Sequence, residues 1–162
     1  YRARATFLLN VSYVNTRYNR LKPLPKAGNM DVASLEPGSL ILCESIEVSN
    51  ETCFHYREAV DDRSSPGGHR QFAHPMAVLA LLIGRTMETI GLPPGSIHTT
   101  QDIEFFGAIQ VDSTIDGTGS VVANNVRQGT RFLILELSAR YLGTDVLIAR
   151  STIAVPEERS AS

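Results

Sequence analysis

Residues 72–90 read FAHPMAVLALLIGRTMETI and carry the most regular apolar pattern in the chain. Apolar residues recur at steps of three and four, as on one face of an α-helix, at Phe72, Met76, Leu79, Ile83, Met87 and Ile90. The central part, residues 76–83, is apolar nearly all round. We therefore expect other elements to cover this helix on more than one side. Gly91 and the prolines that follow it end the helix.

The chain after this helix is typical of strands joined by turns. Strands are predicted over residues 97–106, 113–115, 121–126, 131–141 and 145–155. Turns are predicted at 116–119, 128–129 and 143–144, where glycine lies among polar residues. The strand over 131–141 alternates cleanly and has one apolar face, formed by Leu133, Leu135, Leu137, Ala139 and Tyr141. That face must be buried against something.

Two shorter elements are predicted before the long helix. A strand over residues 40–48 follows a turn at 36–38, and a short helix over 53–60 has Ser49 as its N-cap. A polar, glycine-rich loop over 61–68 separates the two helices. The order strand, short helix, loop, long helix and strands predicts an α+β hot-dog fold, in which an antiparallel sheet wraps around one long central helix. Such a sheet commonly leaves an edge strand free, so we expect a dimer with a continuous sheet.

A chain of 162 residues fits one domain of ordinary size. We expect an N-terminal arm and linker over residues 1–30, the hot-dog domain over 31–157 and a short tail over 158–162. The apolar run at 7–14 fits either a strand or an arm packed on a partner subunit, and the proline-rich part at 22–29 fits an extended linker.

Composition and charge exclude several classes of function. The net charge of −2 and pI near 6.1 argue against binding to nucleic acid, and no apolar run approaches the length of a membrane span. Cys43 and Cys53 are expected to be buried thiols, because neither has a second Cys or His at metal-ligand spacing. We expect a cytoplasmic protein without a metal or cofactor.

Residues 31–157 resemble the MaoC-like hydratase and dehydratase family. Four segments carry the resemblance: residues 35–39 (LEPGS), 50–62 (NETCFHYREAVDD), 73–76 (AHPM) and 103–109 (IEFFGAI). The resemblance implies a hydro-lyase that adds water to an enoyl thioester, or removes it from a 3-hydroxyacyl thioester. It also implies that coenzyme A or an acyl carrier protein carries the acyl group, and that the chain forms a homodimer or a hot-dog heterodimer.

The catalytic loop departs from the family pattern. Family members with hydratase activity carry Asp-x-x-x-x-His before the central helix, but here Pro66 lies five residues after Asp61, and Gly67 five after Asp62. The best remaining acid/base pair is Asp62 with His69, because a glycine-rich loop lets residues seven apart meet. His74 with either aspartate is the next candidate. The alternative is that these aspartates hold a turn and that His74 supports the helix start.

The oxyanion site also departs from the family pattern. Pro75 replaces the glycine that follows the histidine, and proline has no N–H to donate. The Met76 N–H, or the side chain of Arg70 or Gln71, would have to hold the thioester oxygen. Tyr56 and Asp61 are further candidates for binding the substrate.

Three functions therefore remain open. The first is a hydratase or dehydratase with a rearranged Asp/His pair. The second is a non-catalytic hot-dog subunit that pairs with an active partner and shapes its acyl tunnel. The third is a hot-dog enzyme adapted to another reaction, such as isomerisation, cyclisation or thioester hydrolysis, in a specialised pathway.

Overall fold

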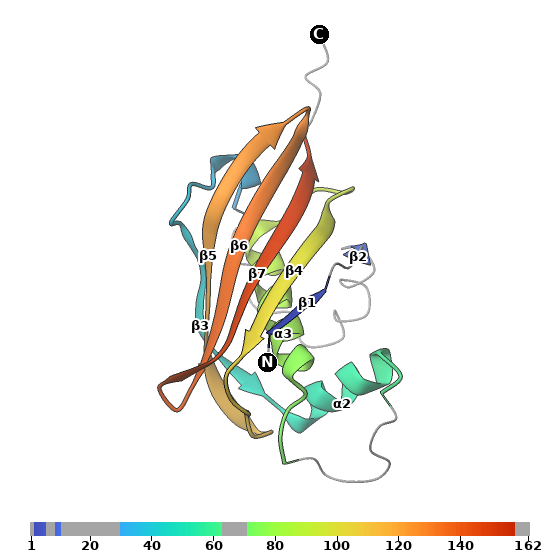
Figure 1. The fold of residues 1–162 in the computed structure, drawn as a ribbon, viewed down its shortest axis with the longest axis vertical. Helices are drawn as coiled ribbons and strands as arrows, with labels where there is room; N and C mark the ends of the chain where they lie inside the picture. Colours follow the sequence, from blue (N-terminus) through green and yellow to red (C-terminus); the bar gives the residue numbers. More distant parts are fainter. Residues whose placement is uncertain (1, 6–8, 11–29, 63–70, 158–162) are drawn as a thin grey trace.

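The computed structural model describes residues 2–5, 9–10, 30–62 and 71–157. Its elements, in chain order, are β1 (Arg2–Ala5), β2 (Leu9–Asn10), η1 (Val32–Ser34), β3 (Leu40–Val48), α2 (Asn50–Ala59), α3 (Pro75–Ile90), β4 (Ile97–Phe105), β5 (Ser113–Arg127), β6 (Thr130–Tyr141) and β7 (Thr144–Pro156). The strands form one antiparallel sheet in the order β1-β4-β7-β6-β5-β3, and β2 also pairs with β4 (Figure 1).

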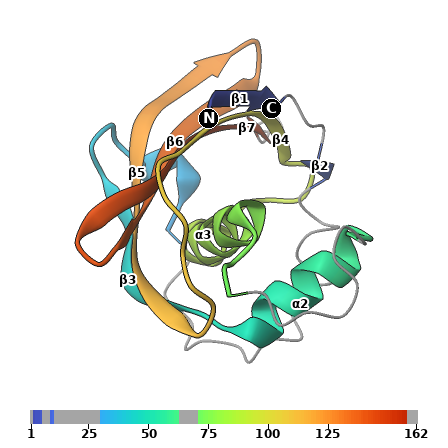
Figure 2. The same cartoon turned by 60° about the horizontal axis from the view of Figure 1, so that its bottom comes forward.

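The sheet curls around α3, which lies inside its curve, and α2 lies at the open side (Figure 2). The apolar face predicted for β6 is confirmed, because four of its five residues have no exposed surface: Leu133, Leu135, Leu137 and Ala139. They meet the buried face of α3, where Leu79 and Leu82 are at most 1% exposed. The predicted α+β hot-dog fold is therefore confirmed.

The turn predicted at residues 116–119 is wrong, because β5 runs through it without a break. Its two glycines serve close packing against α3 and β3 instead. A Cβ on Gly117 would lie 2.7 Å from Ile46 Cδ1 and 2.9 Å from Leu82 Cδ2. A Cβ on Gly119 would lie 3.1 Å from the Cβ of Leu42. Glycine here allows the sheet to approach the helix and does not reverse the chain.

Other predicted boundaries shift for local reasons. The long helix begins at Pro75 and not at Phe72, because His74 caps it and Phe72 forms a bridge with Gln110. The turn predicted at 128–129 is confirmed, with positive φ at both residues. The next hairpin turns one residue earlier than predicted, at Leu142 and Gly143, whose φ values are 52° and 78°.

The two cysteines differ in burial. Cys53 is fully buried on α2, as predicted. The prediction is wrong for Cys43, which is exposed on β3. From Leu42 onward, Leu42, Ile46 and Val48 are buried, and Cys43 belongs to the alternate, outward set. Ile41 is buried as well, where the pairing with β5 is irregular between Leu40 and Leu42.

Part of the N-terminal arm joins the sheet of its own chain. Strand β1 pairs with residues 101–104 of β4, and β2 pairs with residues 97–98. The edge of β4, which would otherwise be free, therefore carries strands from the arm. The rest of the arm from residue 11, the predicted linker at 22–29 and the tail at 158–162 lie outside the described residues. In the part of the chain that is described, no helix has the length and apolar character of a membrane span.

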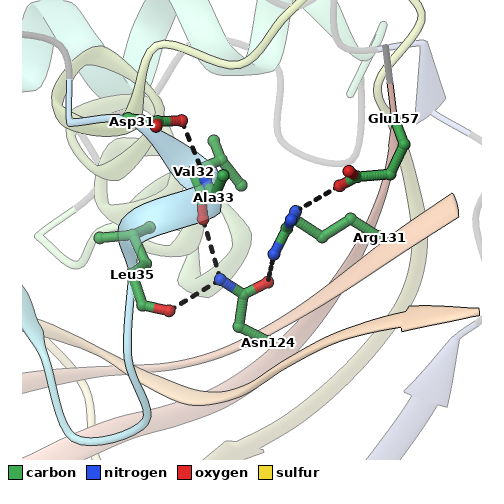
Figure 3. Close-up of polar contacts among 7 residues, drawn as sticks. All are labelled: Asp31, Val32, Ala33, Leu35, Asn124, Arg131 and Glu157. Carbon is green, nitrogen blue, oxygen red and sulfur yellow. Dashed lines mark hydrogen bonds and ion pairs between the residues drawn. The ribbon is translucent and has the colours of Figure 1, made fainter. Parts of the chain in front are cut away.

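A polar network fastens the turn η1 to the sheet (Figure 3). The Asn124 side-chain amide donates to the carbonyl oxygens of Val32 and Leu35, at 2.8 and 2.7 Å. Its oxygen accepts from Arg131 Nη1 at 3.0 Å, and Arg131 Nε donates to Glu157 Oε1 at 2.6 Å. In these contacts each donor of Asn124 and Arg131 therefore meets an acceptor oxygen.

Candidate functional site

The N-terminus of α3 is set by His74 and Pro75. His74 has extended backbone angles and caps the helix, and its Nδ1 accepts the Met76 N–H at 3.2 Å. Pro75 occupies the first helical position, where the missing N–H costs nothing. Of the first two backbone nitrogens of α3, one carries no hydrogen and the other donates to His74.

One face of helix α2 lies against the N-terminus of α3. Its N-terminus is held by Ser49 Oγ, which accepts from the Thr52 N–H at 3.1 Å, and by Asp112 Oδ1, which accepts from the Asn50 N–H at 2.8 Å. Cys53 and Tyr56 follow at helical spacing, and both are at least half-buried. The two caps thus determine which α2 side chains face the start of α3.

The end of α2 positions the two aspartates differently. Asp61 has a φ of 52°, in the left-handed region, and the Asp62 N–H donates to the Arg57 carbonyl oxygen at 3.0 Å. This is the Schellman arrangement that closes a helix, with Asp61 in the position usually taken by glycine. Asp61 is therefore a turn residue whose backbone directs Asp62, and Asp61 itself is exposed.

Tyr56 contacts His74 and lies within electrostatic reach of Asp62. Its ring lies 5.3 Å from the His74 ring between centroids, with the planes tilted by 30°. Burial raises the pKa of the Tyr56 hydroxyl, and the negative charge of Asp62 raises it further. The phenol therefore stays protonated near neutral pH and remains a hydrogen-bond donor. His74 therefore contacts this tyrosine and the charge of Asp62 acts on it, although the two residues lie at opposite ends of the loop.

Two further residues belong to this junction and were not predicted. Burial raises the pKa of the Cys53 thiol, while the Arg57 charge and a hydrogen bond with the His74 backbone oppose that rise. Arg57 Nη1 is buried and has no hydrogen-bond partner. The spacing of positions 53, 56 and 57 on a helix, counted from the Ser49 cap, was the signal that could have found them.

The remaining predicted residues do not all reach the junction. His69 and Arg70 lie outside the described residues. Gln71 is exposed, and its backbone oxygen accepts from the Val111 N–H at 3.1 Å. Met76 is half-buried against the core. Within the described ranges, no three His, Cys, Asp or Glu side chains gather closely enough to hold a metal ion.

The hydrogen bond at His74 determines what its ring does chemically. Because Nδ1 accepts the Met76 N–H, the neutral ring carries its hydrogen on Nε2. His74 is then a donor at Nε2, suited to an oxygen on which negative charge develops. A protonated phenol and an imidazole donor meet at the N-terminus of α3, and a carboxylate acts on the phenol. Such groups suit proton transfer beside a carbonyl group.

Solved structures with this fold support the architecture. The chain superposes on the monoamine oxidase regulatory protein from Archaeoglobus fulgidus with a TM-score of 0.64 and 17% identity, over 83% of this chain and 100% of the other. The (R)-hydratase from A. caviae involved in PHA biosynthesis gives 0.59 and 16%, over 76% and 98%. The HadBC (3R-hydroxyacyl-ACP dehydratase) complex of Mycobacterium tuberculosis gives 0.57 and 14%, over 73% and 96%. No family model and no curated protein sequence matches the chain.

Proposed function

We propose that this protein adds water to an enoyl thioester, or removes it from a 3-hydroxyacyl thioester, at the junction of α2 and α3. The observation that carries the proposal is the contact of Tyr56 with His74 at the N-terminus of α3, where the charge of Asp62 acts on the same tyrosine. The shared fold with an (R)-hydratase and a 3R-hydroxyacyl-ACP dehydratase supports it. The acyl group would be carried by coenzyme A or an acyl carrier protein.

In the proposed hydration, Asp62 with His69 takes a proton from water as the water oxygen bonds to C3 of the acyl group. The C2–C3 π electrons move toward the thioester oxygen, and His74 Nε2–H stabilises the enolate that forms. Return of a proton to C2 completes the addition. Tyr56 keeps the His74 ring in place through the contact of the two rings. Dehydration follows the same steps in reverse.

The test is hydration of a short trans-2-enoyl-CoA by the purified protein, followed by the loss of its conjugated absorbance. Asp62→Asn and His69→Ala are each expected to lower kcat/KM by about 100-fold or more, the usual contribution of a positioned acid or base. Glu58→Gln is the matched control, because Glu58 is exposed on the same helix. The proposal fails if no enoyl thioester is turned over, or if both loop variants retain full activity.

A specific observation favours a second candidate, a non-catalytic hot-dog subunit. Pro75 has no N–H, and the Met76 N–H is bonded to His74, so neither of the first two amides of α3 is available to a thioester oxygen. HadBC is itself a complex of hot-dog chains. In a complex with a chain that carries an intact Asp-x-x-x-x-His motif, this candidate predicts that Asp62→Asn leaves turnover unchanged. The equivalent change in the partner would abolish it.

We also propose that the working assembly contains a second hot-dog chain, either another copy or a related partner. Residues 31–157 would form the catalytic domain, with residues 1–30 as an arm. Sedimentation of the purified protein, alone and with a candidate partner, tests this assembly. A protein that stays monomeric with every hot-dog partner, while fully active, would contradict it.

A further inference from the structure

The β4 edge of the sheet is covered by the chain's own N-terminal strand. Strand β1 pairs antiparallel with β4 from Arg2 opposite Glu104 to Ala5 opposite Gln101, and β2 pairs with residues 97–98 (Figure 1). The other side of β4 pairs with β7. A strand has two sides, so β4 has no room for a partner strand along residues 101–104 while β1 is in place.

The sequence of β4 makes its edge acidic. Asp102 and Glu104 are partly exposed, whereas Gln101 and Ile103 are 3% and 4% exposed. The two acids therefore lie on the outer face of the sheet, away from α3. Strand β4, Ile97–Phe105, contains no Lys or Arg. A second β4 strand would therefore bring no Lys or Arg to this edge.

Strand β1 brings positive residues to these register positions. The register pairs Glu136 with Arg150, Arg150 with Asp102 and Asp102 with Arg4, which forms one row of positions across the sheet. Its charges alternate, and the first two residues form an ion pair at 3.0 Å. In the next row Glu104 lies opposite Arg2. Opposite charges at directly paired positions stabilise an antiparallel pair and select its register.

We propose that β1 is an intramolecular edge cap that keeps β4 from pairing with a second copy of this chain. The proposal rests on the assembly of hot-dog chains proposed above, and it adds that β1 must leave before β4 joins a partner. The β4 strand of a second copy brings two more carboxylates and neither Lys nor Arg, so it is a poorer match than β1. A long edge strand without a cap is a ready template for pairing.

Sedimentation velocity over a range of concentrations tests the cap. The full chain is expected to be monomeric where a variant lacking residues 1–10 dimerises, with a dimer Kd at least about tenfold lower, because β1 no longer competes for the edge hydrogen bonds. The double variant Arg2→Glu/Arg4→Glu should have a dimer Kd between those of the full chain and the shortened variant. Arg127→Glu, which reverses an exposed charge on β5 outside both rows, should leave the monomer unchanged.

A charge swap tests whether the pairing of charges between β1 and β4, and not some other effect of residues 1–10, keeps the protein monomeric. Arg2→Glu alone should favour the dimer. Arg2→Glu combined with Glu104→Arg again places opposite charges at these paired positions and should restore the monomer. The cap is overturned if the full chain and the shortened variant sediment alike. It is equally overturned if the full chain is a dimer that the deletion dissociates, which would show an exchanged arm. Sedimentation reads assembly alone, so a negative enoyl thioester assay counts against the proposed reaction only.

Discussion

Two polar clusters lie in different parts of this molecule and are built in opposite ways. Around Asn124, the side-chain amide of Asn124 bonds through both its nitrogen and its oxygen, and Arg131 links it to Glu157 through an ion pair at 2.6 Å (Figure 3). At the α2–α3 junction, Arg57 Nη1 is buried without a hydrogen-bond partner, and burial perturbs the pKa values of Cys53 and Tyr56.

The difference suggests that the Asn124 cluster stabilises the fold and that the α2–α3 junction serves the proposed activity. A partly buried network of complementary hydrogen bonds stabilises one arrangement of the chain, and here it holds η1 on the sheet. A buried donor without an acceptor costs free energy, and such groups in native proteins commonly mark sites that bind or react. We therefore expect substitutions in the first cluster to change stability, and those in the second to change activity.

The largest expected effect is on activity at His74. His74→Asn keeps a side-chain oxygen that caps α3 but removes the imidazole, so stability should change by less than about 1 kcal/mol. Turnover of an enoyl thioester should fall by about 100-fold or more, since the donor to the thioester oxygen is lost. Thermal unfolding and kcat/KM of the same preparation measure the two effects. Retained turnover would remove His74 from the proposed mechanism.

The second effect is on stability at Asn124. Asn124→Ala leaves the carbonyl oxygens of Val32 and Leu35 without their donor and should lower the free energy of unfolding by about 2 to 4 kcal/mol. The control is Asn125→Ala, at the neighbouring exposed position of β5. Urea unfolding measures both variants. Equal midpoints for the two would show that the network carries no net stability.

A pair of arginine substitutions compares the clusters directly. Arg131→Met breaks contacts with Asn124 and Glu157 and should cost about 1 to 3 kcal/mol. Arg57→Met removes a buried donor that lacks a hydrogen-bond partner. The free energy of unfolding should therefore fall by less than about 0.5 kcal/mol, or rise. The order of the two urea midpoints is the decisive measurement, and a reversed order would contradict the comparison.

The smallest effect concerns pH and His98. Burial lowers the pKa of His98 below its ordinary value near 6.5, and hydrogen bonds with Thr100 and Gln101 only partly oppose this. The unfolded chain therefore binds a proton more readily than the folded one, and stability is lost as the pH falls below about 6.5. His98→Gln should reduce this loss, seen as a smaller drop in Tm between pH 7.5 and 5.5. An unchanged pH dependence would refute the assignment.

Periodicity in the sequence was enough to predict the helix at α3, the apolar face of β6 and the hot-dog arrangement, because a wholly apolar helix and alternating strands must bury each other. Local pattern misled at Gly117, where glycine was interpreted as a turn and serves instead the contact with Leu82, 35 positions earlier. Such a contact has no local signal, since it depends on how closely two distant elements pack.

In the candidate site, too, some features could be predicted from the sequence and others depended on the packing. The resemblance of the sequence to the MaoC-like family singled out Asp62 and His74, and it showed the loss of the spaced Asp/His motif and of the amide at Pro75. Only the tertiary structure decided that Tyr56 stands against His74, that Asp61 serves the turn, and that the arm covers β4. The reason is physical: local sequence sets which groups a segment offers, whereas packing sets which groups meet.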